Sequence, residues 1–220
     1  MDIGNGEFWN GDCLELMADI PDGSVDMVLT DVPYNEVNRK SSGLRNLDKS
    51  LADSAPFDLE KLIRKISTVC SGSAYIFCGT KQISPIIEMM EDNFSIRLGT
   101  WRKTNPSPMN GNRMWLSGSE FCVVGRKSGA TFNEHCKGAV WDHKIERSKI
   151  HPTQKPVGLF ERLISASTNP GDVVLDPFAG SGTTAIAAER TNRKWICIER
   201  DREYYEKACE RVKDEIHRLI

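Results

Sequence analysis

Apolar and polar residues alternate along this chain with two different periods. Short apolar runs rich in Val, Ile, Phe and Trp, typical of strands, are separated by stretches with apolar residues at helical spacing. The expected strands are 7–10, 25–31, 73–79, 95–103, 120–127, 172–178 and 194–200. The expected helices are 13–20, 58–70, 82–93, 156–168, 182–192 and 202–218. This order predicts an α/β protein with a seven-stranded, mostly parallel sheet and helices on both faces.

Two polar segments interrupt the pattern, residues 35–56 and 104–119, and each follows an expected strand. Polar loops of this length in a compact domain usually cover or form a binding site. We therefore expect a single domain over residues 1–220, with a mobile loop at 35–56 and a small target-recognition region at about 104–150.

The composition changes this picture little. Hydrophobic residues make up 39% of the chain and charged residues 27%, as in ordinary globular proteins. The net charge of −2 excludes an overall basic field, so any nucleic-acid contacts must come from local basic clusters. No apolar run approaches the roughly 18 residues that span a bilayer, and the N-terminus lacks the pattern of a secretory signal. We expect a cytoplasmic protein with no membrane segment.

The seven cysteines form no CxxC pair, and several lie in apolar runs, which predicts reduced core thiols rather than a disulfide framework. His135, Cys136 and His143 are chemically able to bind a metal. A fourth ligand at a recognisable spacing is missing, so no metal is expected.

The stretch "DVVLDPFAGSGTT" at 172–184 reads as a buried strand followed by a glycine turn and a helix of small residues. Glycines let the backbone approach a ligand closely and open the helix N-terminus toward it. The next strand ends at Glu199, where a carboxylate can accept hydrogen bonds from two ribose hydroxyls. The turn has neither the spacing of a dinucleotide fingerprint nor a phosphate-binding lysine. A nucleoside without a pyrophosphate, such as S-adenosylmethionine, fits it better.

The stretch "TDVPYN" at 30–35 places an acid, a proline and an aromatic ring directly after a strand. Pro33 fixes its own φ and favours an extended Val32, which aims the carbonyl of that residue. Taken alone, the stretch also reads as an ordinary turn after a strand.

Together, "DVPY" at 31–34 and "DPFAGSGTT" at 176–184 resemble the amino-methyltransferases of DNA, the N4/N6 methylase family, which methylate an exocyclic base nitrogen. "TWRK" at 100–103 and "HPTQKP" at 151–156 are similar to further motifs of that family. The resemblance implies a Rossmann-like, S-adenosylmethionine-dependent methyltransferase fold. The catalytic motif precedes the cofactor motif, as in the circularly permuted beta class.

The resemblance also implies roles for individual residues. In the catalytic turn of Asp31, Val32, Pro33 and Tyr34, the acid and the Val32 carbonyl would accept hydrogens of the amine, and the Tyr34 ring would stack on a flipped base. The implied cofactor contacts are Asp12, Cys13, Asp31, His151, Thr153, Lys155, Asp176, Phe178, Ala179, Gly180, Ser181, Gly182, Thr183, Thr184, Glu199 and Arg200.

Three of these positions have alternative interpretations. Asp12 is implied at the cofactor adenine, but by position it is also a helix N-cap. Lys155 is implied at the cofactor carboxylate, but it is also compatible with a surface lysine. The family usually has proline at position 32, so valine adds an N–H and loosens φ; we expect a working site with a less fixed carbonyl.

Residues suited to phosphates and bases follow two of the strands. The implied nucleic-acid contacts are Asn35, Arg39, Lys40, Arg45, Lys103, Asn105 and Arg113. Trp101 and Trp115 fit either base contacts or the core. A small recognition region is compatible with double-stranded DNA if the site is short or a homodimer shares recognition, or with a single-stranded substrate.

Within the family, aspartate at the first motif position is commoner in adenine-specific members. The resemblance therefore favours a site-specific adenine-N6 DNA methyltransferase, of the kind found in restriction-modification systems, over a cytosine-N4 enzyme. Two alternatives stay open, an RNA adenine methyltransferase and a non-catalytic, cofactor-binding subunit that recognises DNA for an active partner.

Overall fold

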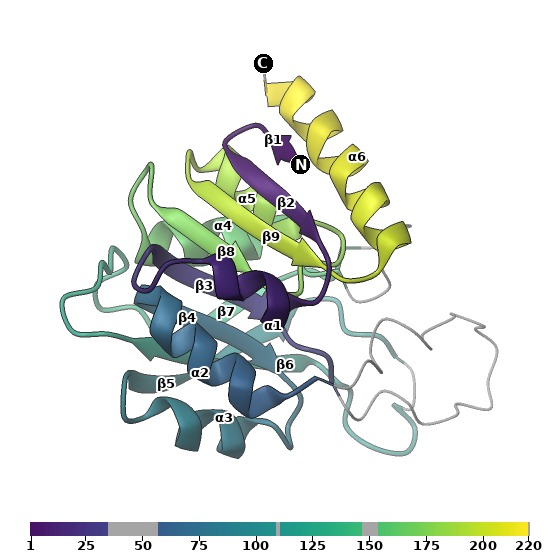
Figure 1. Ribbon diagram of the computed structural model, residues 1–220. Coiled ribbons are helices and arrows are strands. Elements are labelled where there is room, and N and C mark those ends of the chain that lie inside the picture. The colour runs from purple at the N-terminus through teal and green to yellow at the C-terminus, as the bar shows by residue number, and fades with distance from the viewer. Residues whose placement is uncertain (35–56, 109–110, 147–153, 220) are drawn as a thin grey trace.

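The computed structural model describes residues 1–34, 57–108, 111–146 and 154–219. A sheet of nine strands runs through these residues in the order β1-β2-β9-β8-β3-β4-β6-β5-β7 (Figure 1). Helices cover both faces of the sheet, as predicted. None of the helices in the described residues is long and apolar enough to cross a membrane.

The middle of the sheet is parallel. Its strands are β2 (Gly6–Asn10), β9 (Lys194–Glu199), β8 (Val173–Asp176), β3 (Val25–Asp31) and β4 (Cys70–Cys78). Because the carboxyl ends of parallel strands meet at one edge, the acids that end β3, β8 and β9 lie along the same edge.

Antiparallel strands extend the sheet beyond β4. There β6 (Ser119–Arg126) pairs antiparallel with both β4 and β5 (Ser95–Lys103), and β7 (Val140–His143) lies parallel to β5. At the other end, β1 (Asp2–Ile3) pairs antiparallel with β2. The reversal brings the start of β6 and the end of β5 to the edge where β3 and β4 end.

Two hydrophobic clusters cover the two faces of the sheet. One face carries α1 (Cys13–Leu16), the 3-10 turn η1 (Met17–Asp19), α2 (Leu59–Val69) and α3 (Ile83–Met90). The other carries α4 (Val157–Ser167), α5 (Thr183–Arg190) and α6 (Arg202–Leu219). Successive strand residues point to opposite faces, so Met27 and Leu29 of β3 pack on the α4–α6 side and Val28 on the α1–α3 side.

The strand count differs from the sequence prediction. β1 and β7 add two strands to the expected seven, and they are too short, at two and four residues, to show an alternation. β6 and β7 also belong to the central sheet, although both fall within residues 104–150. Residues 104–150 therefore include two strands of the central sheet, and a role of this region in target recognition stays a prediction.

All seven cysteines are free, as predicted. Six are buried, and Cys136 is exposed. Among the residues that the structure describes, no three His, Cys, Asp or Glu side chains are grouped to hold a metal ion.

Candidate active site

The valine of the DVPY turn (residues 31–34) is anchored to the neighbouring strand. The N–H of Val32 donates to the carbonyl of Phe77 in β4 at 3.1 Å and so continues the parallel ladder past the end of β3. The Val32 side chain is 1% exposed and packs on the α1–α3 face. A proline has no N–H to donate. The hydrogen bond and the buried side chain therefore restrain a position that we expected to be looser.

A buried glutamine holds the next residue of the turn. Gln82 precedes α3, and its Nε2 donates to the carbonyl of Pro33 at 3.0 Å. Its Oε1 accepts from the N–H of Gly79 at 2.9 Å, just after β4. The DVPY turn is thus held by β4 and by the segment that follows it.

Four charged side chains gather beside the DVPY turn. The ammonium of Lys155 pairs with Oδ2 of Asp31 and lies 3.0 Å from Oε2 of Glu120. Lys103 lies 2.8 Å from Oε1 of Glu120. The Lys155 side chain is 5% exposed and that of Lys103 is 12% exposed, so the ion pairs are largely removed from water. Two carboxylates and two ammonium groups balance in charge; we call these four residues the charge cluster.

Burial and mutual attraction set the pKa values of the cluster. Burial raises the pKa of Asp31 to about 6 against the attraction of Lys155, and the charge of Glu120 raises it further. Burial opposes the charge of Glu120 too, but the two ammonium groups outweigh it and lower its pKa. Burial likewise opposes the charge of Lys155, whose pKa the two carboxylates nevertheless raise. As the pH falls, Asp31 therefore protonates before Glu120.

The two oxygens of Asp31 have different surroundings. Oδ2 pairs with Lys155, whereas Oδ1 is buried and has no hydrogen-bond partner among the described residues. A buried acceptor without a donor is costly. Oδ1 therefore offers a place for a donor from outside the protein, such as the N–H of an amine.

The tyrosine of the turn contacts the charge cluster. The Tyr34 hydroxyl donates to Oε2 of Glu120 at 3.3 Å, and the ammonium of Lys155 lies 5.5 Å from the centroid of its ring. Burial raises the pKa of Tyr34, and the charges of Asp31 and Glu120 add to the shift. The hydroxyl therefore stays protonated and acts as a donor.

The glycine turn (residues 176–184) follows β8, the strand beside β3. Asp176 is 3% exposed and accepts from the Thr30 hydroxyl at 2.8 Å, from the N–H of Phe178 at 3.0 Å and from the Thr184 hydroxyl. Burial raises its pKa to about 6, although these hydrogen bonds oppose the shift. Asp176, predicted as a cofactor contact, uses its oxygens to shape the turn.

Gly182 is required by packing as well as by conformation. It has φ of 76° and caps α5. A Cβ there would lie 3.1 Å from Val212 and 3.4 Å from Phe8, inside the core. Gly180 has φ of 50°. The glycines thus allow the backbone conformation and packing of the turn, in addition to the close approach of a ligand that the sequence predicted.

Glu199 and the glycine turn form a cradle of polar groups. One oxygen of Glu199 accepts from the N–H of Gly180 at 2.9 Å, and the other accepts from the N–H of Asp201 at 2.8 Å. Burial raises the pKa of Glu199 and these two backbone donors lower it. Each carboxylate oxygen has one donor and can accept another.

Asp12 is the N-cap of α1, which confirms one of its two predicted roles. Its side chain accepts from the N–H of Leu14 at 2.9 Å, and Arg200 lies 4.0 Å away. Cys13, the first residue of that helix, is buried. Both lie beside β9, because the side chain of Asn10 donates to the carbonyl of Glu199 at 2.9 Å.

Arg211 of α6 ties the glycine turn to Lys155. It donates to the carbonyl of Ser181 at 2.8 Å and lies 3.3 Å from the Thr183 hydroxyl. That hydroxyl donates to the backbone carbonyl of Lys155 at 3.4 Å. Lys155 thus contacts the glycine turn through its backbone and the DVPY turn through its side chain.

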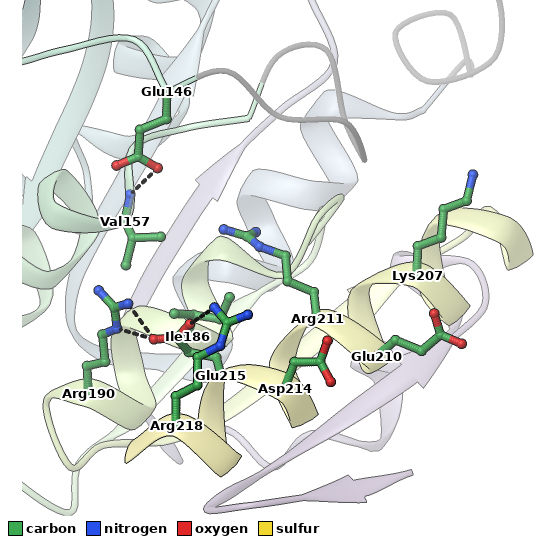
Figure 2. Close-up of a pocket in the computed structure, with 10 residues that line it drawn as sticks. All are labelled: Glu146, Val157, Ile186, Arg190, Lys207, Glu210, Arg211, Asp214, Glu215 and Arg218. Atoms are coloured by element: carbon green, nitrogen blue, oxygen red, sulfur yellow. Dashed lines mark hydrogen bonds and ion pairs between the residues drawn. The ribbon is translucent and has the colours of Figure 1, made fainter.

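Arg211 also lines an open cleft of about 570 Å³ beside α6 (Figure 2). The lining residues are Glu146, Val157, Ile186, Arg190, Lys207, Glu210, Arg211, Asp214, Glu215 and Arg218. Arg190 pairs there with Glu215, and it lies 3.0 Å from Glu161. The lining residues include none from the DVPY turn or the glycine turn, although Arg211 reaches the glycine turn through Ser181.

Three residues that hold the site were not predicted from the sequence, Gln82, Glu120 and Arg211. Glu120 gives the clearest signal, an acid at the start of the apolar stretch "EFCVVG". Its importance depends on the antiparallel pairing that places it opposite Trp101, beside Lys103. That pairing is not evident in the sequence.

The three predicted nucleic-acid contacts within the described residues, Lys103, Asn105 and Arg113, have different surroundings. Lys103 points into the charge cluster, where its ammonium pairs with Glu120, and its predicted contact with nucleic acid stays a prediction. Asn105 braces its loop by accepting from the N–H of Ile145 at 2.6 Å. Arg113 is exposed. The predicted site residues outside the described part of the chain are Asn35, Arg39, Lys40, Arg45, His151 and Thr153.

The two tryptophans have opposite surroundings. Trp101 is 2% exposed, and its indole N–H donates to the carbonyl of His143 at 2.9 Å. Trp115 is 95% exposed, in the loop between β5 and β6. Trp101 is therefore a core residue, and only Trp115 is placed to contact a macromolecule.

Comparisons with known proteins relate both turns to one family. A family model described as DNA methylase matches residues 25–210, which contain both turns and Lys155. The chain is 30% identical to the type II methyltransferase M.HpaI of Haemophilus parainfluenzae, over 93% of this chain and 73% of that protein.

Two solved structures are similar to this chain along nearly its whole length. The complex of M1.HpyAVI with SAM has a TM-score of 0.75 and 31% identity, and the likeness covers 94% of this chain and 98% of the other. The cytosine-N4-specific PvuII DNA methyltransferase has a TM-score of 0.73 and 21% identity, covers 98% and 92% of the two chains, and shares the fold.

Proposed function

This chain belongs to the DNA methylase family, and we propose that within the family it methylates the N6 amine of adenine in DNA. The enzyme uses S-adenosylmethionine and methylates an exocyclic amine of DNA, adenine N6 or cytosine N4. The observation that carries the proposal is the buried Oδ1 of Asp31, which has no partner among the described residues and lies in the turn that matches the family's catalytic motif.

Asp31 and the carbonyl of Val32 act on the amine together. The lone pair of an aromatic amine is delocalised into the base, so the nitrogen is a poor nucleophile. Two acceptors directed at its hydrogens favour a pyramidal nitrogen and concentrate the lone pair. Oδ1 of Asp31 then takes a proton as positive charge develops on the nitrogen, while Lys155 holds Oδ2 in place.

The polar cradle at β8 and β9 fits the nucleoside part of S-adenosylmethionine. When bound, this cofactor supplies a methyl group made electrophilic by its sulfonium. Glu199 would accept hydrogen bonds from the ribose hydroxyls, since each of its oxygens has one backbone donor and a free lone pair. Asp12 and Cys13 would contact the adenine of the cofactor, and Phe178, Ala179 and Arg200 are further proposed contacts.

Lys155 takes a different role from the one that the resemblance implies. Its ammonium already contacts Asp31 and Glu120, so a cofactor carboxylate would have to compete with two buried carboxylates. We therefore assign Lys155 to Asp31. His151 and Thr153, outside the described residues, remain the proposed partners at the methionine end.

Adenine is favoured over cytosine by the aspartate at the first position of the motif, because serine is commoner there in cytosine-modifying members. Cytosine N4 is the alternative, because the PvuII enzyme of that specificity shares the fold. The Tyr34 ring next to Asp31 stacks the flipped base in either case.

The DNA side of the proposal rests on exposed groups near the charge cluster. Arg113 and Trp115 lie in the loop between β5 and β6, where a cation and an aromatic ring can contact phosphate and base. We propose that this loop contributes to recognition, that a homodimer shares the recognition of the site, and that the chain has the permuted beta-class order.

Mass spectrometry of nucleosides tests the proposal. Unmodified double-stranded DNA, single-stranded DNA and RNA are each incubated with the purified protein and S-adenosylmethionine, with the Asp31→Ala protein as the matched control. We expect N6-methyladenine in DNA treated with the wild-type protein and none with the control.

The other outcomes separate the alternatives. N4-methylcytosine would select the cytosine-specific enzyme, and methylation of RNA alone would refute the proposal. Binding of S-adenosylmethionine without turnover on any substrate would point to a non-catalytic subunit.

A further inference from the structure

We infer that Glu120 is a positioning residue of the transfer reaction, because it binds Lys155 and the Tyr34 hydroxyl and thereby keeps Oδ1 of Asp31 free for the amine. This inference deepens the proposed function and rests on it. It assigns a role in the reaction to an acid of β6 that lies in neither of the two turns.

Glu120 is placed where three donors converge. It lies at the start of β6, opposite Trp101 of β5 and one residue before the partner of Cys78 in β4. Lys103 lies 2.8 Å from its Oε1, and Lys155 lies 3.0 Å from its Oε2.

The third donor is the hydroxyl of Tyr34, which lies 3.3 Å from Oε2 of Glu120. Oε2 thus binds both donors that also face Asp31, the Lys155 ammonium and this hydroxyl.

These two donors compete with the substrate for Asp31. Lys155 already pairs with Oδ2, and the Tyr34 hydroxyl is near enough to Asp31 to lower its pKa. Buried donors rarely stay unpaired. If Glu120 could not accept from them, Asp31 would be the remaining carboxylate of the cluster, and they would fill Oδ1. Glu120 prevents this by binding the hydroxyl and part of the ammonium.

Glu120 also balances the charge around Asp31. The three charged groups of the cluster other than Asp31 come from three segments, Glu120 from β6, Lys103 from β5 and Lys155 from the residues before α4. Within the described residues, the other titratable groups that act on Asp31 or are acted on by it are Tyr34, Cys78, Cys122 and Asp176. Loss of the Glu120 charge leaves two ammonium groups for one carboxylate, so Asp31 holds its negative charge more firmly.

A simpler role for Glu120 would be to neutralise two buried lysines for the sake of the fold. Glu120→Gln separates the two roles, since it keeps the shape of the side chain and removes its charge. A purely structural role predicts a lower melting temperature with an unchanged kcat. Positioning predicts that the kcat and the pKa both change in the folded protein.

The experiment measures the pKa of Asp31 by carbon-13 NMR of the aspartate carboxyl groups, with Asp31→Asn to assign the signal, and kcat at saturating DNA and S-adenosylmethionine. In Glu120→Gln we expect a lower pKa of Asp31 and a kcat reduced by about 10-fold to 100-fold. The matched control is Glu134→Gln, which loses a paired contact of 2.8 Å to Arg162 outside the charge cluster. In that control we expect both quantities to match the wild type.

Two further variants test the competition directly. Tyr34→Phe keeps the ring and removes the hydroxyl, so in the Glu120→Gln background it should restore part of the lost kcat. Glu120→Asp keeps the charge but withdraws the carboxylate by one methylene; it should fold even if Glu120→Gln does not, and it should lower kcat several-fold.

Three results would overturn the inference: an unchanged pKa of Asp31 in Glu120→Gln, an unchanged kcat in that variant, or full activity of Glu120→Asp. The NMR titration needs no turnover. If the wild-type protein methylates no nucleic acid, the proposed function fails, and the titration still decides whether Glu120 controls Asp31.

Discussion

Two aspartates at neighbouring strand ends illustrate how the same residue serves different purposes. Asp31 ends β3 and Asp176 ends β8, both are largely buried, and burial raises the pKa of each to about 6. The three donors on Asp176 are neutral groups of Thr30, Phe178 and Thr184. Asp31 has a lysine on one oxygen and no partner among the described residues on the other.

The difference shows that burial and a raised pKa do not by themselves identify a reactive acid. Both aspartates have these properties, and both occur in family motifs. The distribution of hydrogen-bond donors separates them, because a carboxylate with donors on both oxygens shapes a turn, while one with a free oxygen can receive a substrate. Four predictions test this contrast.

The largest effect is expected from Asp31→Ala. Loss of the acceptor for the amine should lower kcat by about 10³-fold, in the range of general acid–base contributions. Binding of S-adenosylmethionine, measured by calorimetry, should remain detectable. Activity above a few per cent of wild type in this variant would mean that Asp31 is not the reactive acid.

Asp176→Ala should affect stability first. The hydroxyls of Thr30 and Thr184 and one N–H lose their acceptor, so the free energy of unfolding should fall by about 3 kcal/mol. Thr30→Val removes only one of these hydrogen bonds and should cost about 1 kcal/mol. Urea denaturation measures both. If Asp176→Ala were as stable as wild type, the contrast between the two aspartates would be lost.

Between pH 4 and 7, activity and the contribution of Asp31 to stability should change in opposite directions. Transfer requires ionised Asp31, so kcat should fall about tenfold per pH unit below the Asp31 pKa of about 6. The folded-state pKa of Asp31 lies above its unfolded value of about 3.9. Its stabilising contribution is therefore fully present below that value and is lost as the pH rises through about 6.

Asp31→Asn isolates the stability effect. The free energy of unfolding of the wild type minus that of Asp31→Asn should decrease as the pH rises from 4 to 7. Denaturation curves at several pH values measure this difference. A difference that grew with pH would contradict the raised pKa of Asp31.

The smallest effect is expected from Val32→Pro. The variant loses the hydrogen bond to Phe77, which contributes about 1 kcal/mol to the free energy of unfolding. Part of that loss is offset because proline lowers the conformational entropy of the unfolded chain. Val32→Ile keeps both the N–H and a branched apolar side chain, so it should be closer to wild type in melting temperature and kcat. A proline variant that exceeded wild type in both would mean that the hydrogen bond has no role.

Much of the fold could be predicted from the sequence, because strand and helix periods depend on local residue patterns. β1 and β7 were missed because they are too short to show a period. The contact between Lys155 and Asp31 joins residues 124 apart. It depends on the backbone of Lys155 meeting the glycine turn, which no local pattern encodes.

The sequence predicted the two motifs of the site, but it did not predict the residues that position them, such as Glu120. Asp31 and Glu199 were found because each ends an apolar strand before a distinctive turn. Glu120 reaches the same edge only because β6 runs antiparallel to β4. Gly182 was predicted for ligand approach, but it also faces the packed side chains of Val212 and Phe8.

The hydrogen bond between Val32 and Phe77 also affects how relatives of this protein can be recognised. Because the neighbouring strand fixes position 32 through its N–H, apolar residues other than proline can occupy it, while Pro33 remains constrained. A motif search that demands proline at both positions would pass over this chain and others built in the same way.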